Sequence, residues 1–218
     1  MDWSVWFSGL WDGTVDTLYM VGISTVFTLI AGLPLGILLV ITDENGLMPA
    51  RIFNQILGAV VNAARSLPFI ILLVVVIPLT RFITGTTIGA TAAIVPLTIA
   101  AIPFFARIAE SGLRDVDKGL VEAALAMGCT PLQIVYKVLI PESLSSLILG
   151  LTITIISLIS YSAMAGAIGG GGLGDLAIRY GYQRFETEVM VATVILLIVL
   201  VQGIQIFGNY VAKSVSKK

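Results

Sequence analysis

The sequence predicts an all-α integral membrane protein with five transmembrane helices, and composition and charge spacing both support this. Of its 218 residues, 57% are hydrophobic and only 11% are charged, and the mean hydropathy is +1.03. Soluble domains carry about 25% charged residues, so a water-soluble fold is excluded. Four stretches without any charge are longer than the ~20 residues that a helix needs to cross the hydrocarbon core. They are residues 18–42, 82–106, 143–174 and 189–212.

A fifth apolar stretch, residues 52–80, is interrupted only by Arg65. In all five stretches the apolar residues are continuous and do not alternate with a period of two. Backbone polar groups must be paired inside a lipid bilayer, so these stretches are expected to be helices and not barrel strands. No interdomain linker interrupts the chain, and residues 1–218 are interpreted as a single membrane domain.

Five spans place the two ends of the chain on opposite sides of the membrane. One side carries eight Lys and Arg residues and the other carries three, which favours an N-terminus outside and a C-terminus inside. The side predicted to be cytoplasmic holds Arg51, Arg107, Arg114, Lys118, Lys137, Lys213, Lys217 and Lys218. The opposite side holds Arg81, Arg179 and Arg184.

Residues 1–17 are expected to form an external interfacial segment. They contain three aspartates and no basic residue, so the positive region of a cleavable signal peptide is missing and the segment is expected to be retained. Four aromatic residues share one helical face, as in a helix that lies on the outer leaflet. They are Trp3, Trp6, Phe7 and Trp11.

The stretch 107–142, between the third and fourth spans, holds nine charged residues and is expected to form a cytoplasmic loop. Asp117 is a suitable N-cap for a short helix over 118–127, and Gly128 is suited to end it in a left-handed conformation. The sequence Thr130-Pro131-Leu132-Gln133 supplies a capping box for a second helix, which we expect to run to Leu139 and to end at Pro141. The helix pair is suited to insertion into a groove on another protein, but a solvated loop would show the same pattern.

Several kinds of chemistry find no support in the sequence. Histidine is absent and Cys129 is the only cysteine, so the chain offers neither an imidazole or thiolate metal site nor an internal disulfide. No phosphate-binding loop of the G-x-x-x-x-G-K-[ST] type is present, so the chain is not expected to hydrolyse ATP or to act as an enzyme. We assign no catalytic residue and no metal ligand.

Glycines mark two places where helices are expected to approach closely. Gly32 and Gly36 form a GxxxG pattern in the first span. Residues 169–174 match G-x-G-x-x-G, but they follow a long apolar helix and not a strand, so a dinucleotide site is not expected there. These glycines are interpreted as residues that bend the backbone or allow tight packing at the outer end of the fourth span.

The charged stretch resembles the EAA loop of permeases from binding-protein-dependent ABC importers. The resemblance is carried by Glu122-Ala123-Ala124, Gly128 and Val138-Leu139-Ile140-Pro141, with Val138 and Ile140 as conservative departures from that pattern. Other segments resemble the permease subunits of methionine importers, so the similarity covers nearly the whole chain. These segments are residues 65–73, 93–98, 161–164 and 171–174.

This resemblance implies a permease subunit of an ATP-driven importer in the bacterial cytoplasmic (inner) membrane, with methionine in its D or L form as the substrate. The implied partners are a second copy of this chain, two cytoplasmic ATPase subunits, an extracytoplasmic methionine-binding lipoprotein and membrane lipid, with no nucleic acid. ATP and Mg would be held by the ATPase subunits, and this chain would hold no cofactor. Substrate would pass from the binding protein to the cytoplasm by alternating access.

Within the resembling loop, five residues are expected to couple the permease to the ATPase. Glu122 would make a polar contact, Ala123 and Ala124 would allow close approach, and Gly128 would form the turn. Pro141 closes the pattern. The two helices would pass the motion of the ATPase subunits to the third and fourth spans, which the loop joins.

A stripe along the fourth span is a candidate wall of the substrate pathway. Polar groups at membrane depth prefer the protein interior or an aqueous cavity, but small and hydroxyl residues also form helix packing seams, so both interpretations stay open. We select Ser157, Tyr161 and Met164 as pathway or gate residues. The full stripe is Gly150, Thr154, Ser157, Tyr161 and Met164.

Arg65 has two possible roles. At mid-bilayer an arginine costs about 2.5 to 3.5 kcal/mol on insertion scales, so it needs compensation. It is either a structural anchor, held by carbonyl groups or an acidic partner, or a contact for a substrate carboxylate.

Other functions remain as alternatives. Another amphipathic amino acid would suit the same importer class. A secondary transporter would be expected to show intramembrane acidic or histidine groups and a duplicated half, which the sequence lacks. A channel or a structural subunit would not need the capped helix pair.

Overall fold

The computed structural model describes residues 3–216, with side chains from Phe7 onward, and every regular element in that range is helical. The expected all-α fold is therefore confirmed. The α-helices are α1 (Trp3–Ile41), α2 (Arg51–Ser66), α3 (Phe69–Val75), α4 (Ile77–Thr84), α5 (Ala90–Arg114), α6 (Lys118–Ala126), α7 (Pro131–Ile134), α8 (Ile140–Gly166), α9 (Gly172–Leu176) and α10 (Thr187–Val215). Two π-helical segments are η1 (Val135–Leu139) and η2 (Ala177–Tyr182).

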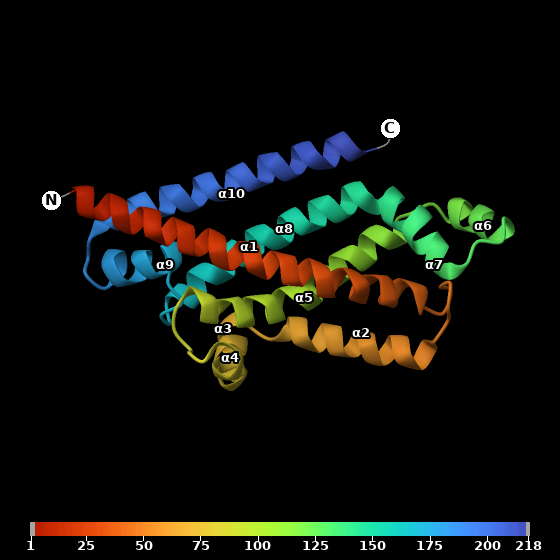
Figure 1. Ribbon diagram of the computed structural model, residues 1–218, viewed down its shortest axis with the longest axis horizontal. Helices are drawn as coiled ribbons and strands as arrows, with labels where there is room; N and C mark the ends of the chain where they lie inside the picture. Colours follow the sequence, from red (N-terminus) through yellow and green to blue (C-terminus); the bar gives the residue numbers. More distant parts are fainter. Residues whose placement is uncertain (1–2, 217–218) are drawn as a thin grey trace.

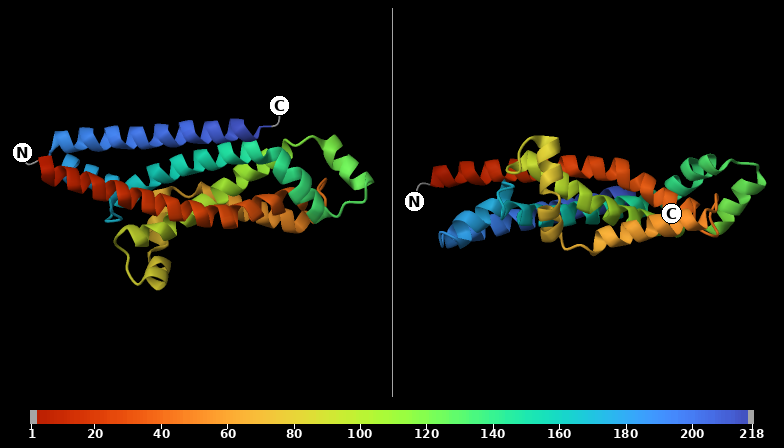
Figure 2. Two further views of the ribbon diagram at one scale, coloured as in Figure 1. Left: turned by 45° about the horizontal axis from the view of Figure 1, so that its top comes forward. Right: turned by 90° about the horizontal axis from the view of Figure 1, so that it is seen from below.

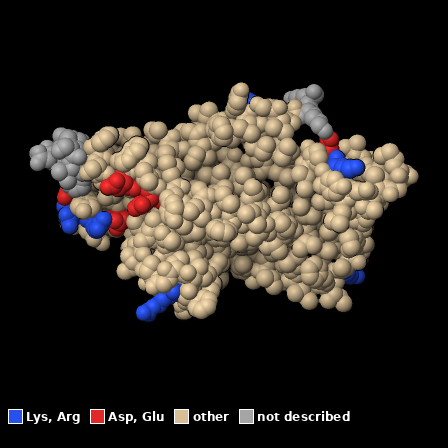
Figure 3. Space-filling view, viewed as in Figure 1, with Lys and Arg blue, Asp and Glu red and all other residues tan. Residues whose placement is uncertain are grey.

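The helices α1, α2, α5, α8 and α10 each make a pass along the long axis of the molecule (Figure 1). Four candidate spans contain α1, α5, α8 and α10, and the bent pair α2 and α3 would make a fifth. The two ends of the chain lie at opposite ends of the bundle, and α6 and α7 project beyond it at the end nearer the C-terminus (Figures 1 and 2). Charged side chains gather toward the two ends, with a wide uncharged region between them on the face shown in Figure 3.

The second apolar stretch, residues 52–80, is helical as expected but does not form one continuous helix. The chain breaks at Leu67 and Pro68, and α2 and α3 meet at 103°. A residue before proline avoids the α region, and Leu67 is extended at φ −77° and ψ 125°. Arg65 therefore lies in the last turn of α2. Gly85, with φ +74°, then ends α4, so the next pass begins at Ala90 and not at residue 82.

The first pass is longer than expected, because α1 continues without interruption from Trp3 to Ile41. Residues 3–17 thus continue the helix of the first span and do not form a separate helix. Phe7 and Trp11 are exposed, whereas the side chains of Trp3 and Trp6 lie outside the described residues. The location of this segment at an outer membrane surface stays a prediction.

The close packing of α1 on α5 depends on the two glycines of the GxxxG pattern. A side chain at Gly36 would lie 2.8 Å from the carbonyl oxygen of Ala106, and one at Gly32 would lie 3.1 Å from the carbonyl oxygen of Ile102. Without a hydrophobic driving force between helices in lipid, such close backbone contact is a main source of association. The predicted contact is confirmed.

The glycine-rich segment after α8 makes the packing contacts that the sequence indicated. The fourth span ends at Gly166, and the chain then turns through Gly171 and Gly172, which have φ values of +77° and +78°. A side chain at Gly174 would collide with the backbone of Ala163 in α8. The Leu173 amide also donates to the hydroxyl of Thr17 at 2.9 Å, which ties the segment to α1.

Candidate functional site

The predicted pair of short helices is present, and we name residues 117–134 the elbow. The Asp117 carboxylate accepts from the Gly119 amide at 2.6 Å and begins α6. Gly128 follows the end of α6 in the left-handed conformation, with φ +79°, as expected. Thr130 and Gln133 form the expected capping box. The Gln133 amide donates to the Thr130 hydroxyl at 3.4 Å, and the Thr130 amide donates to the Gln133 side-chain oxygen at 2.9 Å. The start of each of the two short helices is thus stabilised by local hydrogen bonds.

The second helix of the elbow does not end at Pro141, contrary to expectation. It passes through the π-helical segment η1 into α8, so residues 131–166 form one continuous helical run. In η1 the Ile140 amide donates to the Val135 carbonyl, five residues earlier. This wider turn directly precedes Pro141, which lacks an amide donor and would disturb an ideal α-helix at this point. Pro141 therefore lies in the first turn of α8 and marks a bulge, not an end.

The two alanines of the elbow face different directions. Glu122 and Ala123 are exposed, whereas Ala124 is only 2% exposed. Ala124 packs against Leu113 and Ile134 in a cluster that also contains the end of α1. The small side chain of Ala124 thus lets α6 pack closely against the rest of this chain. Its expected role in close approach to a partner stays a prediction.

Large apolar side chains cover the outer surface of the elbow, and our sequence analysis did not identify them. A nine-residue helix next to a turn cannot bury all of its apolar residues, and this was the available signal. Several large exposed apolar side chains in one short segment are typical of a protein interface. They are Leu120 (45% exposed), Leu125 (50%), Met127 (77%), Leu132 (70%) and, just beyond the elbow, Tyr136 (55%).

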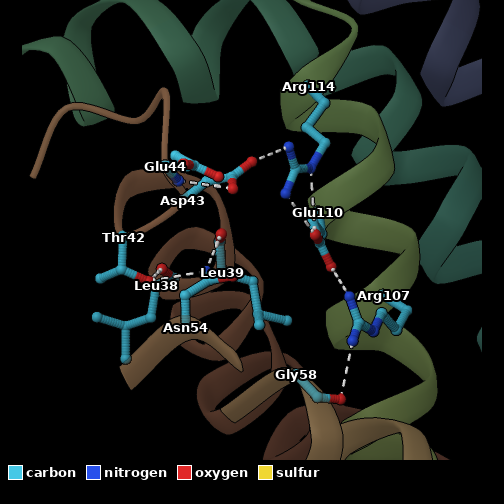
Figure 4. A network of polar contacts seen from close by, with 10 residues as sticks. All are labelled: Leu38, Leu39, Thr42, Asp43, Glu44, Asn54, Gly58, Arg107, Glu110 and Arg114. Carbon is cyan, nitrogen blue, oxygen red and sulfur yellow. Dashed lines mark hydrogen bonds and ion pairs between the residues drawn. The ribbon is translucent and has the colours of Figure 1, made fainter. Parts of the chain in front are cut away.

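A chain of charged side chains fastens the end of α5 to α1 and α2 (Figure 4). Glu110 is only 8% exposed and accepts from Arg107 at 2.6 Å and from Arg114 at 2.9 Å. Arg114 also pairs with Asp43, at the start of the α1–α2 connection, and Arg107 donates to the Gly58 carbonyl in α2 at 2.9 Å. This network was not predicted from the sequence. Its signal was the spacing of Arg107, Glu110 and Arg114, which share one helical face.

The pairing of Asp43 stays intact at neutral pH. The Arg114 guanidinium and the Glu44 amide both donate to the Asp43 carboxylate and hold its pKa below the ordinary value of 3.8. A carboxylate with a lowered pKa in the folded state stabilises that state above its ordinary pKa. The contribution of Asp43 is lost only as the pH falls through the lower pKa of the folded protein.

The predicted stripe on α8 divides into two parts. Gly150 and Thr154 are buried, and a side chain at Gly150 would collide with Ile108, so this half is a packing seam against α5. The Ser157 hydroxyl donates to the Ile153 carbonyl of its own helix at 3.0 Å. Tyr161 stacks on Phe69 of α3, with ring centroids 4.7 Å apart. Of the three selected pathway residues, Ser157 and Tyr161 thus make contacts within the chain.

Of the three residues selected for the substrate pathway, Met164 is the one that lines a cleft. It is 48% exposed and lines an open cleft of about 650 Å³ between α3, α8, η2 and α10. Ile70, Ile178 and Gln202 line the same cleft. The cleft wall is mostly apolar, which suits an apolar side chain better than a charged group.

Arg65 is exposed, and its guanidinium carbon lies 6.0 Å from the centre of the Phe104 ring. Among residues 3–216, the structure records no hydrogen bond or ion pair of Arg65. The carbonyl or acidic anchor that is one of the two expected roles of Arg65 is therefore not found within that part of the chain.

Comparison with protein families decides the classification. Residues 32–217 match the family described as binding-protein-dependent transport system inner membrane component. The chain belongs to this family. The inner-membrane, multi-pass location implied by the resemblance is thereby confirmed.

Individual relatives of this permease are similar over almost their whole length. A probable D-methionine transport system permease protein MetI of Vibrio cholerae is 54% identical over 205 residues, covering 94% of this chain and 91% of the relative. The methionine import system permease protein MetP of Bacillus subtilis is 44% identical over 209 residues, covering 96% and 94%. A chain in the inward-facing MetNI methionine ABC transporter matches with 45% identity and a TM-score of 0.96, covering 100% of both chains.

Proposed function

We propose that this permease is the membrane subunit of an ATP-driven importer that moves methionine from an extracytoplasmic binding protein into the cytoplasm. Family membership and the methionine-transport names of relatives up to 54% identical support this proposal. The observation that carries the coupling mechanism is the elbow, whose capped helices present Glu122, Ala123 and an apolar surface beyond the bundle.

The elbow is proposed to dock into a groove on a cytoplasmic ATPase subunit. An amphipathic helix that leaves apolar side chains exposed is suited to such a groove, and Glu122 adds a polar contact at its edge. The basic residues at the start of α2, near the end of α5, in and just after the elbow, and at the end of α10 would then face the cytoplasm, as the positive-inside rule requires. The N-terminus would lie outside and the C-terminus inside.

The complete importer is proposed to contain two copies of this chain, two ATPase subunits that hold ATP and Mg, and a methionine-binding lipoprotein on the outer face. Motion of the ATPase subunits would be passed to the membrane through two connections. Ala124 and its cluster hold α6 against the ends of α1, α5 and η1. The helical run from Pro131 to Gly166 joins the elbow directly to the fourth span.

Uptake of radiolabelled methionine tests the proposed function. Vesicles containing this permease with its co-encoded ATPase and binding protein are expected to accumulate methionine only when ATP is present inside. Excess unlabelled D-methionine, L-methionine and other amphipathic amino acids would be added as competitors to rank the substrates. The permease should also co-purify with the ATPase, whereas a secondary transporter or a channel would work alone. Uptake that needs no ATPase would contradict the proposal.

Met164→Ala is expected to change the uptake rate or the basal ATPase activity about fivefold, the factor that corresponds to about 1 kcal/mol. The flexible thioether at the cleft is suited to seal a pore and to contact an apolar substrate side chain, and alanine does neither. Met48→Ala is the matched control, because Met48 is similarly exposed at 53% but lies in the α1–α2 connection. If uptake, substrate stimulation and basal ATPase activity all stay unchanged in Met164→Ala, Met164 has no gating role.

A further inference from the structure

One face of α2 is polar although the helix belongs to a membrane-spanning pass. The residues of this face are exposed in the single chain, and the adjacent face carries exposed apolar residues such as Ile56 and Val60, each 61% exposed. Exposed amides and an arginine are costly in lipid, so the polar face must meet water or another protein surface. We name it the α2 polar stripe, and it consists of Arg51, Gln55, Asn62, Arg65 and Ser66.

The stripe runs along almost the whole length of α2. Arg51 begins α2 beside the short α1–α2 connection, where it pairs with Glu44 at 3.5 Å. Arg65 lies 14 residues further along the helix, which corresponds to about 21 Å at a rise of about 1.5 Å per residue. The hydrocarbon core is about 30 Å thick, so Arg65 is far from the end of the bundle where α2 starts.

The helix break that follows Arg65 leads to residues in contact with the pathway candidates. The break at Leu67 and Pro68 directs the chain across the bundle, and the first residues of α3 contact α8. Phe69 stacks on Tyr161, and Ile70 lines the apolar cleft together with Met164. A cation without an acidic partner in the described chain thus lies next to the break that leads to an apolar cleft.

We propose that the α2 polar stripe is a wall of the aqueous substrate path and that Arg65 binds the carboxylate of the amino acid in transit. The proposal rests on the function proposed above. A guanidinium offers parallel donors that match a carboxylate, and an arginine over an aromatic face, as over Phe104, keeps its N–H edge available for such a ligand. The apolar cleft would receive the side chain of the same substrate.

Thiol labelling in the assembled complex tests whether the stripe faces water. Cys129 is first replaced by serine, and Asn62→Cys on the stripe is compared with Val60→Cys on the adjacent apolar face. Asn62→Cys is expected to react readily with small charged methanethiosulfonates, and faster with an anionic reagent than with a cationic one because Arg65 is near. Val60→Cys is expected to be nearly unreactive. An unreactive Asn62→Cys would mean that a second copy of the chain or lipid covers the stripe, and it would overturn the proposal.

The same complexes test the role of Arg65. Methionine is expected to protect Asn62→Cys from labelling, and methioninol, which lacks the carboxylate, is expected not to protect it. Adding Arg65→Gln should remove both the preference for the anionic reagent and the protection, and Arg65→Lys should restore the preference. If the preference and the protection survive in Arg65→Gln, the carboxylate assignment is wrong.

Measurements of methionine uptake distinguish a failure of this inference from a failure of the proposed function. Arg65→Gln is expected to lower the uptake rate about tenfold, which corresponds to the loss of a charge-assisted hydrogen bond. Arg81→Gln is the control, because Arg81 is also an exposed arginine but lies in α4, outside the stripe, and this variant should transport like the wild type. A wild-type complex without ATP-dependent methionine uptake would overturn the proposed function. A wild-type complex that transports methionine and an Arg65→Gln complex that equals it would overturn only the carboxylate assignment.

Discussion

Gly128→Pro is expected to abolish ATP-driven uptake while leaving membrane insertion intact. Gly128 has φ +79°, which proline cannot adopt because its ring holds φ near −65°. Its amide also donates to the Leu125 carbonyl at 2.9 Å, and proline lacks this donor. The turn would open, and the exposed apolar residues on its two sides, such as Leu125 and Leu132, would lose their relative placement. The measurement is ATP-dependent methionine uptake, together with the amount of ATPase that co-purifies.

Gly128→Asn is the matched variant for this position. Asparagine adopts the left-handed region at small cost, and the space next to Gly128 is open, so most of the uptake should remain. Equal uptake by Gly128→Pro and the wild type would show that the elbow turn has no part in coupling.

Glu110→Leu is expected to lower the stability of the folded permease by about 3 kcal/mol, because removing one partner of a buried ion pair leaves an uncompensated charge. Glu110 is the only acidic residue that contacts both Arg107 and Arg114 in the described network. The expected loss of stability lies at the low end of the range for buried ion pairs, because the Arg114 side chain is 44% exposed. For a chain of this size the change corresponds to a decrease in Tm of about 6 to 12 °C. Thermal unfolding of the detergent-solubilised complex measures it.

Glu44→Gln provides the control for the Glu110 variant. The pair of Glu44 with Arg51 is 3.5 Å long, with both side chains more than 60% exposed, so its loss should cost less than about 1 kcal/mol. A Tm for Glu110→Leu that equals that of Glu44→Gln would mean that the network contributes no more than a surface pair.

Local features of the elbow could be predicted from the sequence because each depends on residues a few positions apart. The Asp117 cap, the Thr130 capping box and the left-handed Gly128 were all confirmed. The break in the second pass is also local, since Pro68 restricts Leu67. We did not predict it, because the apolar pattern continues across the break and hides it.

Contacts between residues far apart in the chain could not be predicted from the sequence in the same way. The α8 stripe fitted both a pathway wall and a packing seam, and only the position of Ile108 showed that its Gly150 end is a seam. The network around Glu110 joins residues more than 60 positions apart, from Asp43 in the α1–α2 connection to Arg114 at the end of α5. No spacing rule links such residues, because their contact exists only once α1, α2 and α5 have packed.

The sequence by itself determined the helical membrane class, the family and the capped elbow, because hydrophobic run length and capping depend on neighbours along the chain. Only the tertiary structure decided that Ala124 faces inward while Ala123 faces outward, and that Arg65 stays without an acidic partner in the described chain. The physical reason is that a helix exposes and buries its faces according to which other helices cover it. That coverage results from the packing of the whole bundle.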